Sequence, residues 1–170
     1  IRSVRLLPEH PRALDAAVEA ILDADMIVLA PGSLYTSIIP NLLVDGIADA
    51  IRDSKAVKLY VCNVMTQEGE TEGYTVSDHI QALFSHSYPQ LFRLCLTNSM
   101  PIPESIARRY AQEGAEPIYH DTEKCRALGV ELIERPVASL ENGLVRHNPG
   151  HLAHELMTIY EEYVSSKNPT

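Results

Sequence analysis

Apolar and polar positions along the chain alternate between the period of strands and the period of helices. Three mostly apolar runs, Met26–Ala30, Lys58–Cys62 and Leu91–Thr97, have the length and composition of strands buried on both faces. Between these runs, apolar residues recur at three- and four-residue spacings, which indicates helices with one buried face. The alternation predicts right-handed βαβ crossovers, and therefore an α/β fold with a Rossmann-like parallel sheet flanked by helices.

The remaining elements follow from local signals. Thr75 with Asp78 three residues later resembles a capping box at the start of a helix, and Asn142-Gly143 is typical of a hairpin turn. We expect helices over Pro11–Leu22, part of Leu34–Val44, Gly46–Arg52, Glu104–Glu113 and Gly150–Tyr163, and further strands over Val4–Leu7, Pro117–Tyr119, Val130–Glu134, Pro136–Leu140 and Leu144–Arg146.

Length and charge narrow the class of protein. The 170 residues fit one domain, residues 1–170, and no linker divides them. A formal net charge of −9 argues against sequence-independent binding of nucleic acid, which depends on basic residues, but it leaves a small nucleotide possible as a ligand. The sequence shows no secretory signal and no apolar run long enough for a membrane span, so we expect a cytoplasmic protein.

The cysteine and histidine residues indicate neither a disulfide framework nor a metal site. The three cysteines, Cys62, Cys95 and Cys125, are too far apart to form a C-x-x-C motif. The first two lie in apolar runs, where reduced thiols buried in the core are expected. His151 and His154 are three residues apart but match no zinc motif, so we expect solvated histidines and no metal site.

The loops that follow the buried strands carry the candidate binding chemistry, because parallel sheets bind ligands beyond the carboxyl ends of their strands. The loop Pro31–Ser37 leaves a strand and enters a helix, and Gly32 lets the backbone approach a ligand closely. Free N–H groups at a helix start favour an anion such as phosphate. The alternative is an ordinary strand–turn–helix junction with an N-cap. The loop matches neither a P-loop nor a nucleophile elbow.

The next two loops are less specific. Asn63 directly follows a strand and could bond a base or a ribose, and Thr66 lies nearby. The acidic residues Glu68, Glu70 and Glu72 could hold a divalent cation such as magnesium against a phosphate, although a solvated acidic loop is the simpler interpretation. After the third strand, Asn98 and Ser99 could serve the site or merely form a turn. The candidate ligand-binding residues are therefore Pro31, Gly32, Ser33, Tyr35, Thr36, Ser37, Asn63 and Thr66.

A longer combination of motifs resembles one family. The stretch from Ala24 to Val44, with Ala-Pro-Gly-Ser-Leu-Tyr-Thr-Ser at its centre, is similar to the YvcK-type branch of the CofD-like family, the gluconeogenesis factors. Further family motifs follow in the same order along the chain, at Tyr60–Gln67, Gly69–Thr75 and Asn142–His147. The resemblance therefore covers nearly the whole chain. Two departures are Ala30, where the family commonly has Gly, and Glu68, where Pro is frequent.

The resemblance implies a Rossmann-like fold whose Gly-rich nucleotide-binding turn is absent here, so the chain looks like the carboxy-terminal portion of a larger CofD-like domain. It implies binding of a UDP-sugar in a cleft lined by Pro31–Ser37, Asn63 and Thr66, and a link to gluconeogenic growth, peptidoglycan supply and cell shape. No reaction is established for that branch. The related CofD branch transfers a phospholactyl group from a GDP-linked donor to a deazaflavin.

Three functions therefore remain open. The first is a nucleotide-sugar-binding regulator, the second is a CofD-type transferase with a metal-assisted donor, and the third is an interaction domain without a small ligand. The apolar and aromatic residues of the last helix, Tyr160 and Tyr163 among them, permit a homo-oligomer without requiring one.

Overall fold

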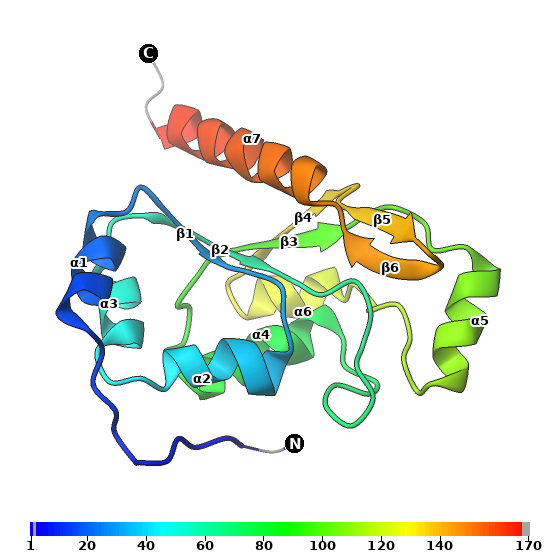
Figure 1. Cartoon of the computed structure of the whole chain (residues 1–170). Coiled ribbons are helices and arrows are strands. Elements are labelled where there is room, and N and C mark those ends of the chain that lie inside the picture. The colour runs from blue at the N-terminus through cyan, green and yellow to red at the C-terminus, as the bar shows by residue number, and fades with distance from the viewer. Residues whose placement is uncertain (2, 168–170) are drawn as a thin grey trace.

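A parallel sheet forms the centre of the molecule. The computed structural model describes residue 1 and residues 3–167. Four parallel strands lie side by side in the order β1-β2-β3-β4, and a separate antiparallel pair, β5-β6, lies beyond them (Figure 1). The strands are β1 (Met26–Leu29), β2 (Val57–Val61), β3 (Leu94–Asn98), β4 (Glu131–Arg135), β5 (Ala138–Glu141) and β6 (Leu144–His147).

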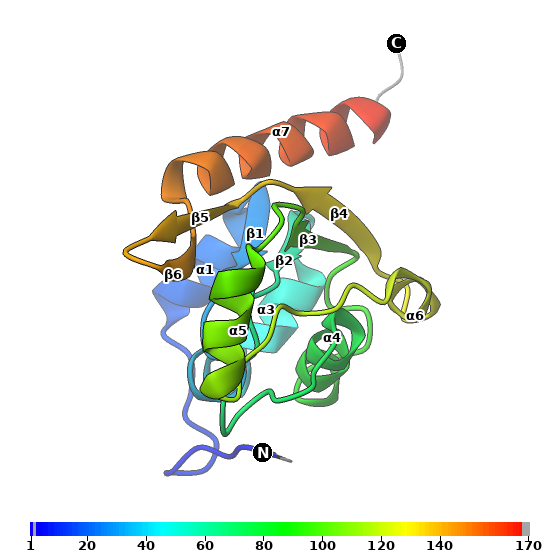
Figure 2. The ribbon, with the colours of Figure 1, turned by 90° about the vertical axis from the view of Figure 1, so that its right-hand side faces the viewer.

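Helices cover both faces of this sheet. The long helix α7 crosses one face, and α2, α4 and α6 lie against the other, as the two views in Figures 1 and 2 show. The helical elements are α1 (Asp15–Asp23), a π-helical turn η1 (Leu34–Ile38), α2 (Ile39–Leu42), α3 (Ile47–Asp53), α4 (Val76–Ser85), α5 (Glu104–Gln112), α6 (Thr122–Ala127) and α7 (Pro149–Lys167). The architecture is the predicted Rossmann-like α/β arrangement.

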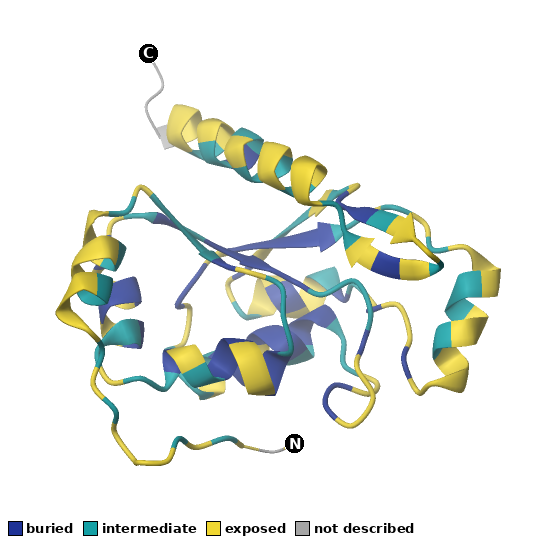
Figure 3. Ribbon diagram, in the orientation of Figure 1, coloured by how far each residue is buried: buried dark blue, intermediate teal, exposed yellow. Residues whose placement is uncertain are grey.

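The two central strands send alternate side chains to opposite faces. Leu59 of β2 and Leu94 of β3 point toward α7, where they join the cluster that includes Ile159. Tyr60 and Cys95 point the other way, into the larger cluster under α2 and α4. Because successive residues of a strand face opposite sides, both faces of β2 and β3 are buried, as the dark strands in Figure 3 show. The three cysteines are buried and free.

The first strand is different because it lies at an edge. Its side chains pack on both faces, Leu29 and Ile27 on one cluster and Met26 and Val28 on the other, but only Leu29 is fully buried. The predicted burial on both faces is therefore incomplete. The helix predicted before it exists as α1, but its apolar face is only half covered, and Leu14 and Leu22 remain 78% and 47% exposed. Among the described residues no strand pairs with the outer side of β1.

Most local predictions agree with the structure. The capping box is formed: the Asp78 amide donates to the Thr75 hydroxyl, and the Thr75 amide donates to the Asp78 carboxylate. The hairpin β5-β6 turns at Asn142 and Gly143, which have the positive φ angles of 50° and 74° that Asn-Gly turns favour.

Two local predictions do not, and one helix was missed. The segment 4–7 forms no strand, since only Val4 packs on the core while Leu7 is exposed. Segment 117–119 makes only an isolated bridge, between Pro117 and Met65. Helix α6 was not predicted because its six residues are too few to show a period. None of the helices in the described part of the chain has the length and apolar character that crossing a membrane requires.

Candidate functional site

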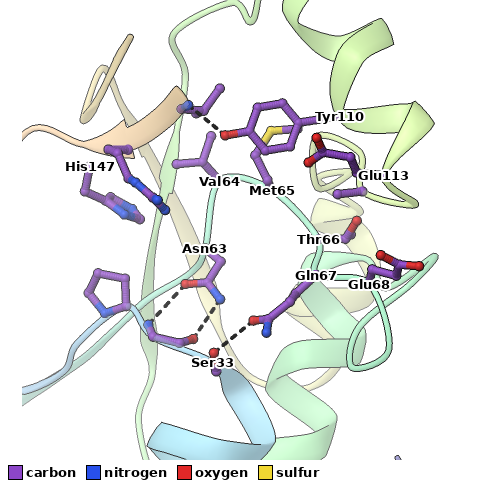
Figure 4. Close-up of a pocket in the computed structure, with 15 residues that line it drawn as sticks. Ser33, Asn63, Val64, Met65, Thr66, Gln67, Glu68, Tyr110, Glu113 and His147 are labelled. Carbon is purple, nitrogen blue, oxygen red and sulfur yellow. Dashed lines mark hydrogen bonds between the residues drawn. The ribbon is translucent and has the colours of Figure 1, made fainter. Parts of the chain in front are cut away.

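A cleft of about 570 Å³ lies beyond the carboxyl ends of β1 and β2. One wall is formed by the two loops that leave these strands, and the opposite walls come from α5 and β6 (Figure 4). The lining residues are Pro31, Gly32, Ser33, Asn63, Val64, Met65, Thr66, Gln67, Glu68, Tyr110, Glu113, Ala115, Val145, Arg146 and His147. The site is therefore where a parallel α/β sheet is expected to bind a ligand.

Asn63 joins the two strand-exit loops. Its Oδ1 accepts a hydrogen bond from the Gly32 amide at 3.2 Å, and its Nδ2 donates to the Gly32 carbonyl at 2.8 Å. A second link runs from the Ser33 hydroxyl to Gln67 Oε1, at 2.9 Å. These bonds are the dashed lines at the bottom of the cleft in Figure 4. The loops therefore form one rigid surface, with Gly32 and Ser33 beside the open volume.

The helix start after this loop already holds a carboxylate of the same chain. Glu70 is 6% exposed, and its Oε1 accepts hydrogen bonds from the Tyr35 amide at 3.2 Å and the Thr36 hydroxyl at 3.1 Å. The other oxygen, Oε2, is buried without a hydrogen-bond partner among the described residues. Because helix starts favour anions, Glu70 occupies the position where the sequence predicted an external phosphate, and an external ligand is left with the neighbouring surface at Gly32 and Ser33.

Thr66 lines the cleft but its polar groups serve the fold. The side chain is 4% exposed, its hydroxyl accepts from the Glu116 amide at 2.8 Å, and its own amide donates to the Glu116 carbonyl at 2.8 Å. These two bonds attach the second loop to the segment after α5. Thr66 therefore shapes the cleft, while Asn63 and Ser33 are the more accessible polar groups.

Basic and acidic residues both line the cleft. Arg146 and His147 of β6 lie on one side, and Glu68 and Glu113 lie on the other. Burial lowers the pKa of His147, an effect that the nearby backbone of Cys62 partly offsets. The imidazole is therefore neutral at pH 7, and its Nε2 is buried without a partner among the described residues. Arg146 is exposed and carries the cleft's positive charge.

The structure divides the eight sequence-predicted residues into two groups. Five of them, Pro31, Gly32, Ser33, Asn63 and Thr66, line the cleft. The other three lie on the turn η1 outside it: Tyr35 is buried with its hydroxyl 2.8 Å from that of Tyr74, Thr36 contacts Glu70, and Ser37 is exposed.

Two walls of the cleft were missed by the sequence prediction. The hydroxyl of Tyr110 on α5 accepts a hydrogen bond from the Val145 amide at 2.9 Å, which ties α5 to the hairpin and completes the opposite side. The segment Asn142–His147, part of the family resemblance, was the signal that could have indicated the place of β6 in the cleft. The third strand exit does not contribute, because Asn98 bonds the Met100 backbone and the Ala138 amide as a turn former.

The acidic residues of the second loop do not converge on one point. Glu68 lies along the cleft, Glu70 faces η1, and Glu72 accepts from the Gly69 amide at 2.8 Å. Among residues 1 and 3–167, no group of three or more His, Cys, Asp or Glu side chains is placed to hold a metal ion.

Fold and cleft together define a Rossmann-like α/β domain with an open cleft at the ends of its parallel strands. The model of the family "2-phospho-L-lactate transferase CofD" matches residues 1–138, and this chain belongs to the CofD family. Similar proteins include the gluconeogenesis factor of Halalkalibacterium halodurans, 44% identical over 92% of this chain and 49% of that protein, and the gluconeogenesis factor of Bacillus subtilis, 41% identical over 95% and 51%.

A solved structure agrees with these relatives. The crystal structure of a member of the UPF0052 family from Bacillus halodurans superposes with a TM-score of 0.89 at 44% identity, covering 92% of this chain and 51% of that one. The chain thus spans about half the length of each of these relatives.

Proposed function

We propose that the cleft binds a nucleotide-sugar, of the UDP-sugar class, and that the protein acts as a cytoplasmic regulator of the gluconeogenesis-factor type. The observation that carries this proposal is the joined surface of Gly32, Ser33 and Asn63 beside an open cleft at the ends of two parallel strands. Membership of the CofD family and the names of the relatives support it.

The composition of the cleft suits such a ligand. Its volume of about 570 Å³ falls in the range of small-molecule sites, roughly 300–1,000 Å³. Arg146 offers a guanidinium to a diphosphate, since planar guanidinium groups bind phosphate with paired hydrogen bonds. The Ser33 hydroxyl, which donates to Gln67 in the free protein, would turn its proton to a phosphate oxygen when the ligand binds. The apolar wall of Val64, Met65 and Tyr110 offers a surface for a pyrimidine ring.

A regulatory role fits the chemistry of the walls better than turnover does. Glu68 and Glu113 are the cleft's carboxylates, and within the described residues neither forms a hydrogen bond or an ion pair with His147. We propose that ligand binding reports the supply of cell-wall precursor, and so links central carbon metabolism to peptidoglycan supply and cell shape. The open edge of β1, next to Pro31, is where a Gly-rich turn of the family type would complete the nucleotide site.

The second candidate is a transferase of the CofD type. The family model that matches residues 1–138 carries that name. In this alternative the same cleft holds a nucleotide-linked donor. Incubating the full-length protein with such a donor, a deazaflavin acceptor and magnesium separates the two functions: a modified acceptor supports the transferase, and an unchanged acceptor leaves the regulator as the better proposal.

Binding of UDP-N-acetylglucosamine to the full-length protein tests the first proposal. At a hundredfold excess over Kd, a ligand that binds only the folded state stabilises it by about 2.7 kcal/mol, which thermal melting detects. Calorimetry then compares Ser33→Ala and Arg146→Gln with Arg126→Gln, a control that removes an exposed arginine ion-paired to Glu123 on α6. We expect the first two to weaken binding and the control to leave it unchanged. No melting shift at saturating ligand rejects the proposal.

A further inference from the structure

A second cavity lies at the opposite edge of the sheet, where β2 and β3 begin. Its volume is about 250 Å³, below the usual range for drug-sized ligands. Its lining includes Ser54, directly after α3, whereas the cleft is lined by residues of β6. In Figure 1, α3 and the β5-β6 hairpin lie at opposite ends of the sheet. The five residues of β2 separate the two sites by roughly 15 Å. The lining includes Ser54, Lys55, Lys58, Arg93 and Tyr163.

The charges around this cavity are unusual for so acidic a protein. Lys55, Lys58 and Arg93 all line it, although the chain carries a net charge of −9. Within the described residues none of these three cations forms an ion pair with a carboxylate, whereas the arginines of α3, α5 and α6 mostly do. Unpaired like charges repel one another, so their convergence on one cavity favours an anionic occupant.

The neighbouring groups cancel this positive charge only in part. Asp53 is the near carboxylate and favours the charged form of Lys58, but it bonds Arg52 at 2.8 Å and forms no ion pair with Lys58 within the described residues. The Lys58 ammonium donates to the Arg52 carbonyl at 2.9 Å. Burial lowers the pKa of Lys58, and the charge of Asp53 offsets only part of that effect. A bound anion would offset the rest.

A hydroxyl donor completes the set. Ser54 is 6% exposed, and its Oγ accepts a hydrogen bond from the Ala56 amide at 3.2 Å. Its own proton has no acceptor in the part of the chain that the structure describes, so it can donate to a ligand in the cavity. One hydroxyl, two ammonium groups and one guanidinium are the donors that a phosphate group takes.

We propose that this cavity is a second binding site, separate from the cleft, for a small phosphate-bearing molecule held by Ser54, Lys55, Lys58 and Arg93. The site stands on its own residues and does not depend on what the cleft binds. Its small volume suits one or two phosphate groups and leaves no room for a whole nucleotide-sugar.

Titration of the full-length protein with inorganic pyrophosphate tests the site. At 150 mM salt, where the Debye length is about 8 Å and loose surface attraction is weak, we expect saturable shifts of the backbone amide NMR signals of residues 54–58 and 90–94. Signals of Gly32 and Asn63 report any pyrophosphate in the cleft, and they should respond alike in the parent and in a protein that carries Lys55→Gln and Arg93→Gln. Because both side chains would make charge-assisted contacts, we expect the double variant Lys55→Gln, Arg93→Gln to bind pyrophosphate about tenfold more weakly, or weaker still.

A charge-matched control separates a site from general attraction. The double variant Arg5→Gln, Arg126→Gln removes the same net charge from exposed ion pairs elsewhere, and it should bind pyrophosphate as the parent does. The Lys55→Gln, Arg93→Gln protein should still bind UDP-N-acetylglucosamine if the cleft does so. Equal losses in both double variants, shifts confined to the cleft, or the absence of saturation would each overturn the second site.

Discussion

Replacing Glu70 by alanine removes the carboxylate on which the start of η1 rests. Its Oε1 accepts from the Tyr35 amide and the Thr36 hydroxyl, and hydrogen bonds to a charged group contribute about 1.5–3 kcal/mol each. Removing the unpartnered Oε2 from the interior offsets part of that loss. We therefore expect a destabilisation of about 3 kcal/mol, which for a chain of this size corresponds to a fall in Tm of about 6–12 °C.

Glutamine at position 70 is the matched control, since it keeps an oxygen for the Tyr35 amide. We expect Glu70→Gln to cost about 1 kcal/mol. Urea unfolding measures the unfolding free energy of both variants. The same measurement on Thr36→Val, alone and combined with Glu70→Ala, gives the coupling energy between the Thr36 and Glu70 side chains. We expect the combined loss to fall short of the sum, because the Thr36 contact is already absent when Glu70 is removed. A Glu70→Ala protein within 0.5 kcal/mol of the parent, roughly the noise of surface substitutions, would refute this role.

Three further changes test the site and the fold. Asn63→Asp keeps an acceptor for the Gly32 amide but loses the donor to the Gly32 carbonyl and adds a negative charge. Calorimetry should therefore show UDP-sugar affinity lowered by about tenfold or more. Unchanged affinity would place the phosphates elsewhere. Burial tends to raise the pKa of Asp121, but hydrogen bonds from Ser77 outweigh it and lower that pKa. Stability from Asp121 is therefore full above about pH 4 and lost as the pH falls further, and Asp121→Asn should flatten that part of a urea-unfolding pH series. Burial lowers the pKa of His79, so the folded state resists protonation of this imidazole. The unfolding free energy should therefore decline as the pH falls from about 7 to 5. The same decline in the His79→Gln variant would contradict this.

Local sequence signals anticipated the sheet and much of its surroundings. The apolar runs at β2 and β3 predicted strands buried on both faces because alternate residues there meet two different helix layers. The capping box at Thr75 and the Asn-Gly turn were predictable since each depends on residues three or fewer apart. Edge position is not local, and so the incomplete burial of β1 was missed.

The candidate site was predictable where it follows directly from strand ends. Gly32, Ser33 and Asn63 lie in the cleft because the carboxyl ends of β1 and β2 share one edge. The partner of Thr36 could not be predicted, since Glu70 is 34 residues away and its carboxylate looked like part of a solvated loop. The wall formed by Tyr110 depends likewise on a contact with Val145, 35 residues further along.

A crystal structure of the full-length protein with UDP-N-acetylglucosamine tests the central claim most directly. We expect the diphosphate within hydrogen-bonding distance of Ser33 and Arg146, and the Asn63–Gly32 pair intact beneath it. Ligand density at another surface, with the cleft beyond β1 and β2 empty at saturating ligand, would contradict it.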